Sequence, residues 1–169
     1  MVKNVLTVLE SPWESQNGDI AGHSMRPFVE GLAELYNWKL VYRTFMSTQE
    51  LHYLVGGEAF SQHASRSILY ISSHGSGGRL QTGIKFQAKI NLGSVAQKLP
   101  SSNKYNIEGV WIGACDVGAS NSLSKFLDLG GAWWAGGYGC EVAWDTGMLI
   151  DLAVLNEAMA SPARKQLTK

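Results

Sequence analysis

Short apolar runs alternate along the chain with longer stretches in which apolar residues recur every three or four positions. The short runs indicate buried β-strands, and the longer amphipathic stretches indicate helices. The predicted strands are residues 4–9, 40–45, 67–72, 108–114 and 132–135. The predicted helices are residues 25–36, 48–55, 92–99, 120–129 and 146–159. This alternation predicts an α/β fold, an open sheet of mostly parallel strands with helices on both faces.

Polar residues mark several ends of these elements. Asn37 suits the end of the first helix, Ser47 or Thr48 can cap the second, and Asn91 can cap the third. Residues 76–90 combine residues typical of turns with alternating apolar positions. This pattern predicts a hairpin or an irregular loop that projects from the edge of the sheet.

The length of 169 residues suits one domain, which we expect to span residues 1–160, followed by a polar tail at 161–169 that frays. Fourteen basic side chains balance fourteen acidic ones, so charge indicates no nucleic-acid or membrane partner. The first apolar run breaks at Glu10 and Pro12, too early for a signal peptide or a membrane span. We therefore expect a cytoplasmic protein.

Cys115 and Cys140 are the two cysteines of the chain. Two cysteines without a nearby His/Cys spacing pattern favour neither a disulfide framework nor a zinc site. We expect no metal and no organic cofactor. A single cysteine in an apolar strand is usually a small buried hydrophobic residue, and this is the interpretation that we give Cys140.

Two of the predicted strands end in residues that can carry out chemistry. His74 follows the strand at 67–72, and Cys115 follows the strand at 108–114. Ligands of open parallel sheets bind at the carboxyl ends of the strands, so neighbouring strands would bring both side chains to one edge. A thiol is only partly ionised at neutral pH, and an imidazole can take its proton and later deliver it to a leaving group. We predict that Cys115 is a nucleophile and His74 its base.

Acyl transfer also needs donors for the negative charge that develops on the carbonyl oxygen. Gly75 and the small residues before Cys115 allow a substrate to approach the backbone closely. We therefore predict an oxyanion site made of the backbone amides of Gly75 and Cys115.

Three segments of the chain, ILYISSHG, GVWIGACDVG and AWWAGGYGCEVAWDTGMLIDL, occur in this order. Together they resemble the catalytic core of the caspase-like (clan CD) cysteine peptidases, which include caspases, metacaspases, paracaspases, legumains, gingipains and CHAT peptidases. The third segment is similar to the caspase segment that passes through Val-Ser-Trp-Arg into the last helix. The resemblance extends from the first strand to the last helix and implies a cysteine endopeptidase, closest to the small prokaryotic members, with a His74–Cys115 dyad.

The resemblance also implies a substrate preference. In caspases the arginine of Val-Ser-Trp-Arg holds an acidic side chain of the substrate, and the matching position here is Asp145. An aspartate there implies a preference for Arg or Lys before the cleaved bond, with Trp144 as an apolar wall. Asp19 and Glu14 can add a second carboxylate. Many members that prefer basic residues carry an acid two places before the cysteine, where this chain has Gly113.

Several alternatives stay open from the sequence. Asp145 equally suits the N-cap of the last helix. The segment between Cys115 and Trp133 holds about one helix, so activation by cleavage of a linker is not expected. The tail offers no apolar run for a further edge strand, which favours a monomer or a subunit of something larger. The sequence shows no regulatory domain, so we expect a regulatory partner chain. Apart from a peptidase acting on protein or peptide substrates, the chain fits a catalytically silent scaffold module or another α/β cysteine hydrolase.

Overall fold

This computed structural model describes residues 4–12, 23–60, 64–82, 88–100, 105–119 and 121–162. A five-stranded parallel sheet lies at its centre. The strands are β1 (Val5–Glu10), β2 (Lys39–Thr44), β3 (Ser67–Ser72), β7 (Ile107–Gly113) and β8 (Trp134–Gly137). They lie in the order β2-β1-β3-β7-β8, and every neighbouring pair is parallel. The predicted open parallel sheet is confirmed.

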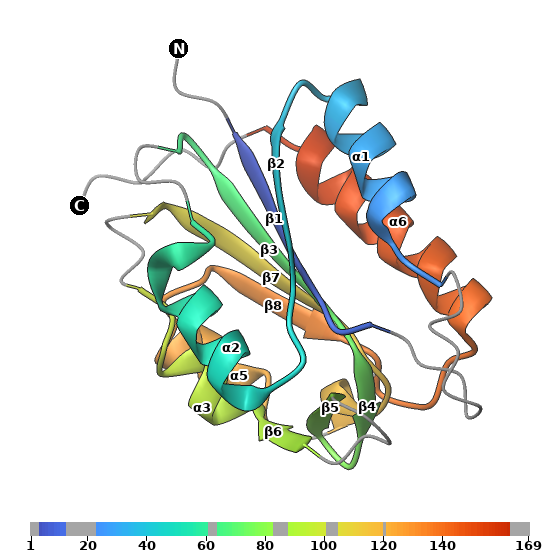
Figure 1. Cartoon of the computed structure of the whole chain (residues 1–169). Coiled ribbons are helices and arrows are strands. Elements are labelled where there is room, and N and C mark those ends of the chain that lie inside the picture. The colour runs from blue at the N-terminus through green and yellow to red at the C-terminus, as the bar shows by residue number, and fades with distance from the viewer. Residues whose placement is uncertain are drawn as a thin grey trace.

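Helices cover both faces of this sheet (Figure 1). One face carries α1 (Arg26–Leu35) and α6 (Trp144–Ala160), and the other carries α2 (Thr48–Tyr53), α3 (Leu92–Ala96) and α5 (Ser124–Asp128). This arrangement confirms the α/β fold. Within the described ranges, none of the helices has the length and apolar character needed to cross a membrane.

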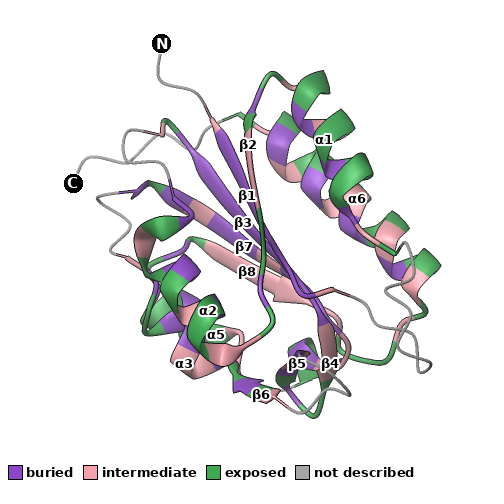
Figure 2. Cartoon of the chain, in the orientation of Figure 1, coloured by how far each residue is buried: buried purple, intermediate pink, exposed green. Residues whose placement is uncertain are grey.

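The two central strands β1 and β3 are buried along their whole length (Figure 2). An apolar cluster that includes Phe45, Val95 and Phe126 packs on one face of the sheet. A second cluster, which includes Val29 and Leu155, packs on the other face. Strands that are covered on both faces are apolar at nearly every position, which is why they stand out as continuous runs in the sequence.

A small antiparallel sheet projects from the end of β3. It consists of β4 (His74–Ser76), β5 (Arg79–Thr82) and β6 (Ala88–Asn91), in that order. Gly77 and Gly78 connect β4 to β5 with φ angles of 55° and 74°. Positive φ at both positions is typical of the tight two-residue turns that match the twist of a hairpin. The predicted hairpin is therefore present, but it begins at His74 and not beyond it.

The predicted helix ends agree with the structure. The Ser47 side chain accepts a hydrogen bond from the Glu50 amide at the start of α2, and the Asn91 side chain accepts one from the Gly93 amide at the start of α3. Asn37 adopts a φ of 53° just after α1, the left-handed conformation that often ends a helix. The short polar side chains at these positions thus act as the local sequence predicts.

The segment between β7 and β8 differs from its prediction. In place of one helix over 120–129, the chain forms a 3₁₀ turn at Val117–Ala119 and then the short helix α5. The region between this turn and α5 contains serine and asparagine. Their side chains compete for backbone hydrogen bonds and so favour turns over a continuous helix. The last strand, predicted as buried over 132–135, begins at Trp134. It lies at the edge of the sheet, and Trp133 just before it is 39% exposed.

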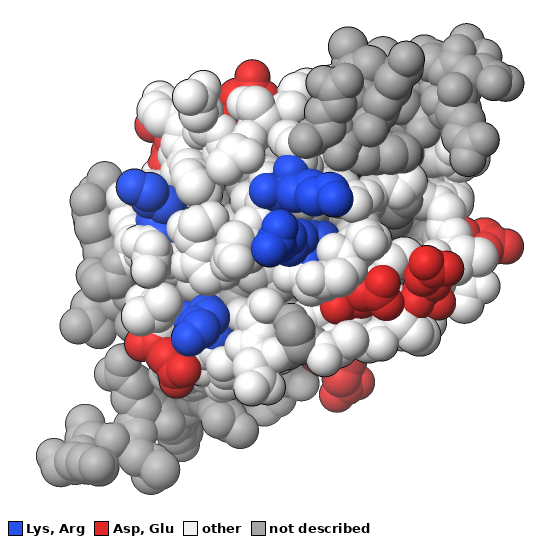
Figure 3. Space-filling model, turned by 90° about the horizontal axis from the view of Figure 1, so that it is seen from below, with Lys and Arg blue, Asp and Glu red and all other residues white. Residues whose placement is uncertain are grey.

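Charged side chains are scattered over the face of the molecule seen in Figure 3, with uncharged residues between them. The chain carries equal numbers of basic and acidic residues. The described residues form one exposed salt bridge, Arg26–Glu30, and one buried salt bridge, Arg66–Glu108. This face presents no continuous band of one charge. The predicted frayed tail falls mainly on residues 163–169, which lie outside the described ranges.

Candidate active site

The two strands that precede His74 and Cys115 are neighbours in the sheet. β3 and β7 pair in parallel, and Ser72 lies opposite Gly113. His74 and Cys115 each follow two residues later, so both leave the sheet at the same edge. A Cβ atom placed on Gly75 would lie 2.2 Å from the Cys115 carbonyl oxygen and 2.7 Å from its amide nitrogen. The backbones around His74 and Cys115 are thus in direct contact, as the adjacent-strand prediction requires.

This contact makes Gly75→Ala a sensitive substitution. The new methyl group would overlap backbone atoms of Cys115, which cannot move away as a flexible side chain can. We expect a loss of about 1–3 kcal/mol in the free energy of unfolding, measured by urea denaturation. Gly139→Ala is the control, because a Cβ atom there has no neighbour within 4 Å. Equal stability of the two variants would contradict the contact.

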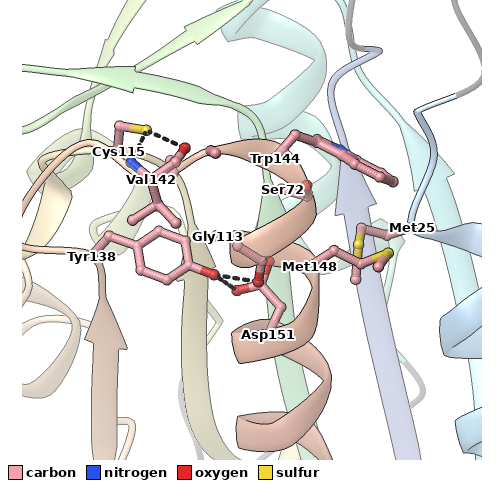
Figure 4. Close-up of a pocket in the computed structure, with 12 residues that line it drawn as sticks. Met25, Ser72, Gly113, Cys115, Tyr138, Val142, Trp144, Met148 and Asp151 are labelled. Carbon is pink, nitrogen blue, oxygen red and sulfur yellow. Dashed lines mark hydrogen bonds between the residues drawn. The ribbon is translucent and has the colours of Figure 1, made fainter.

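The Cys115 sulfur lies between a donor and an acceptor of one residue (Figure 4). The Val142 amide donates a hydrogen bond to the sulfur at 3.4 Å, and the thiol donates one to the Val142 carbonyl oxygen at 3.6 Å. The amide can stabilise a thiolate, and the carbonyl can accept a proton from a thiol. Cys115 is only partly buried, so a substrate can reach it. The sulfur therefore has a partner in either protonation state.

His74 is half-buried at the start of β4. Burial lowers the pKa of its imidazole below the ordinary value of 6.5. The ring is consequently neutral at neutral pH, and only a neutral imidazole can accept a proton. This is the protonation state that a general base needs.

The chain turns sharply after Cys115. Asp116 adopts a φ of 61°, a conformation that is uncommon for residues other than glycine and that frequently occurs at functional sites. The Asp116 amide donates to the Cys140 carbonyl oxygen at 3.2 Å, and the Gly118 amide donates to the Tyr138 carbonyl oxygen at 2.7 Å. Because these two amides are already used, the amides of Cys115 and Gly75 stay the candidates for an oxyanion site.

A narrow cleft with a volume of about 20 Å³ lies beside Cys115 and is partly open to solvent. Its walls come from the ends of β3 and β7, the segment after β8 and the first turns of α6. The lining residues are Met25, Ser72, Gly113, Ala114, Cys115, Tyr138, Val142, Ala143, Trp144, Gly147, Met148 and Asp151. Within the described residues, no group of three or more His, Cys, Asp or Glu side chains could hold a metal ion.

The predicted substrate-binding residues lie in different places. Trp144 lines the cleft, where its ring stands 4.9 Å from the ring of His23. Asp145 is exposed in the first turn of α6, where its carboxylate accepts a hydrogen bond from the Thr146 amide at 2.8 Å. The lining of the cleft does not include Asp145. The N-cap of α6 is Ala143, so the alternative that Asp145 caps this helix is wrong.

Other predicted residues fall outside the cleft or outside the described ranges. Asp19 and Glu14 belong to residues 13–22, which the structure does not describe. Cys140, which we interpreted as a buried hydrophobic residue, is exposed. It lies in the segment after the edge strand β8 and not within an apolar strand.

Asp151 is the cleft residue that the sequence analysis missed. It is 4% exposed, and it accepts hydrogen bonds from the side chains of Tyr70, Trp111 and Tyr138. Burial raises the pKa of its carboxyl group, and the three donors partly oppose this effect. An acid between Ile150 and Leu152, in an otherwise apolar stretch of helix, was the available signal, because a buried charge is costly without partners.

A comparison of the chain with models of known protein families found no match, and a search of curated proteins found no significant match. The arrangement of residues at this edge of the sheet therefore carries the functional interpretation.

Proposed function

We propose that this protein is a caspase-like cysteine endopeptidase that cleaves protein or peptide substrates after Arg or Lys. Cys115 is the nucleophile, and His74 is first a general base and then a general acid. The observation that carries the proposal is the parallel pairing of β3 with β7, together with the packing of Gly75 on the Cys115 backbone. Two residues able to perform acyl transfer thereby leave the sheet side by side.

In the proposed reaction the Cys115 sulfur attacks the substrate carbonyl carbon while His74 takes the thiol proton. The amides of Gly75 and Cys115 stabilise the negative charge on the carbonyl oxygen. Breaking of the peptide bond releases the amine, which receives the proton from His74, and leaves an acyl group on Cys115. A water molecule, deprotonated by His74, then attacks this thioester and releases the carboxylic acid and the thiol. The chemistry uses no metal and no organic cofactor.

Labelling with an acyloxymethylketone that carries Arg next to the reactive group tests this proposal. We expect modification of wild-type protein at Cys115, identified by mass spectrometry of the digested protein. Cys140→Ala should be labelled like wild type, because Cys140 is exposed and the proposal gives it no role. Cys115→Ala should not be labelled.

Two outcomes would argue against parts of the proposal. Equal labelling by a probe with Asp in place of Arg would reject the preference for basic residues. Absence of labelling, together with no cleavage in a peptide library, would reject the peptidase and favour a silent scaffold module. Hydrolysis of small esters without cleavage of peptides would favour another cysteine hydrolase.

The pH dependence of cleavage provides a further prediction. Burial lowers the pKa of His74, so the protonated ring, which cannot act as a base, accumulates only below pH 6.5. We expect kcat/KM for an Arg-containing peptide to fall to half its maximum at a pH below 6.5. For the same reason the unfolded state binds the proton more tightly, and this residue's contribution to stability is lost as the pH falls below 6.5.

Kinetics over pH 4–8 would check this prediction. His52→Gln is the control, because His52 lies on α2 and contacts Ser94 at 3.1 Å, outside the cleft lining. This variant should leave the acid limb unchanged. An acid midpoint at or above 6.5 in wild-type protein would contradict a buried neutral base.

A further inference from the structure

A buried carboxylate lies at the floor of the cleft beside Cys115. Three donors from separate parts of the chain converge on Asp151: the hydroxyl of Tyr70 on β3 at 2.6 Å, the indole N–H of Trp111 on β7 at 2.5 Å and the hydroxyl of Tyr138 at 2.5 Å. Neither of the salt bridges between described residues includes Asp151. Acids are rarely buried to this degree without a cationic partner. The carboxylate is thus held by neutral donors alone in the described part of the chain.

The three donors do not use every acceptor position of this carboxylate. An ionised carboxylate has about four lone-pair sites. Trp111 and Tyr138 donate to Oδ1, and Tyr70 donates to Oδ2, which leaves a site on Oδ2. A Cβ atom on Gly113 would lie 2.6 Å from this same oxygen. The Asp151 carboxylate therefore packs directly on the Gly113 backbone, two residues before Cys115, and a larger residue at position 113 would displace it.

The rest of the cleft lining is largely apolar and can contact the stem of a substrate side chain. Met25, Val142, Trp144 and Met148 line it together with the buried acid. In Figure 4 Cys115 and Trp144 lie above, and the Tyr138 hydroxyl points toward the Asp151 carboxylate below them. Lysine and arginine combine a chain of methylene groups with a charged end, and the guanidinium group forms strong hydrogen bonds with carboxylates.

We propose that Asp151 binds the cationic side chain of the substrate residue that precedes the cleaved bond. This inference rests on the proposed function and deepens it, because it names the group that recognises Arg or Lys. It assigns recognition to the floor of the cleft and not to the exposed carboxylate of Asp145. A cation bound there would supply the positive partner that the described residues do not provide.

Asp151 also links α6 to the sheet through its three donors, and that structural role alone predicts a different result. A purely structural acid would change stability when replaced but would not change the selectivity between charged and neutral substrates. The decisive measurement is therefore a ratio of rates for two substrates on the same protein, because a general loss of stability cancels in it.

The test compares kcat/KM for a peptide with Arg before the cleaved bond and for the same peptide with citrulline, which has nearly the same shape but no charge. We expect wild-type protein to prefer Arg by about 100-fold, the effect of a buried charge pair, and Asp151→Asn to lose most of this preference. Glu157→Gln is the matched control, because it removes one exposed acid from the same helix. It should keep the wild-type ratio.

Asp145→Asn tests the competing assignment. Loss of the Arg preference in Asp145→Asn, with a wild-type ratio in Asp151→Asn, would overturn the proposal. A wild-type ratio in Asp151→Asn that cleaves normally would overturn it as well, while leaving the peptidase itself intact.

A second measurement needs neither turnover nor a stable variant. Benzamidine, a small aromatic cation, should slow the alkylation of Cys115 by iodoacetamide in wild-type protein, and neutral benzamide should not. Equal effects of the two compounds would overturn the proposal even if Asp151→Asn does not fold. A different outcome would separate the cation site from the proposed function. If benzamidine but not benzamide protects Cys115, Asp151→Asn removes this protection, and no peptide is cleaved, then the cation site is supported and the proposed function is rejected.

Discussion

Replacing His74 with alanine is expected to lower kcat/KM for an Arg-containing peptide by about 10²–10⁴-fold, the usual contribution of a general acid–base residue. The reason is that the Cys115 thiol would lose the group that takes its proton and the leaving amine the group that supplies one. His74 follows β3 at the same edge where Cys115 follows β7, and burial keeps its imidazole neutral.

Initial cleavage rates, with circular dichroism to show that the fold is kept, would measure this loss. His52→Ala is the control, since His52 is also a partly buried histidine but contacts Ser94 away from the cleft. Protection of Cys115 by benzamidine should persist in His74→Ala, because the cation site does not include His74. Wild-type turnover in this variant would mean that another group activates Cys115, and the dyad would be rejected.

Replacing Arg66 with alanine is expected to destabilise the fold by about 3–5 kcal/mol, because it leaves the Glu108 carboxylate buried without its charged partner. The two side chains are 7% and 13% exposed, and the guanidinium bonds the carboxylate at 2.5 and 3.1 Å. Arg66 also donates to the carbonyl oxygens of Ala158 and Ser161 at the end of α6. Its guanidinium lies 5.1 Å from the ring centre of Trp38. One side chain thus joins β7 and the last helix.

Urea denaturation of Arg66→Ala and Arg26→Ala would test this expectation. The Arg26–Glu30 pair is exposed and lies within one helix, so its loss should change the free energy of unfolding only slightly. The double substitution Arg66→Met with Glu108→Leu should recover much of the stability, because it removes both charges together. A loss in Arg66→Ala as small as in Arg26→Ala would show that the buried pair contributes little.

Much of the fold could be predicted because its strands and caps depend on local patterns. The strand at Ser67–Ser72 is found at its predicted bounds, since a strand buried on both faces is a continuous apolar run. Asn91 caps its helix as predicted because the cap needs only its own side chain and the next amides. The placement of His74 and Cys115 at one edge of the sheet could be predicted because each follows such a strand and parallel strands have their carboxyl ends at the same edge.

Features that depend on distant contacts could not be predicted in this way. The prediction that the last strand is buried was wrong. This strand lies at the edge of the sheet, where it has only one neighbour, and the order of strands in a sheet cannot be read from the local sequence. Asp151 was missed because its donors, Tyr70, Trp111 and Tyr138, lie 81, 40 and 13 residues away along the chain. Asp145 was favoured from a sequence similarity, but its side chain faces solvent and bonds its neighbour Thr146.

The connection between the two sheets has a mechanical consequence. Only Ser73 separates β3, in the centre of the large sheet, from β4, the first strand of the small one, and β4 begins at His74 itself. The imidazole is therefore carried by the projecting hairpin, whereas the sulfur is anchored through Val142 to the segment that enters α6. Movement of the hairpin at the Gly77–Gly78 turn would therefore also move the imidazole. Any tilt of the hairpin relative to the large sheet would change the distance between the His74 ring and the Cys115 sulfur.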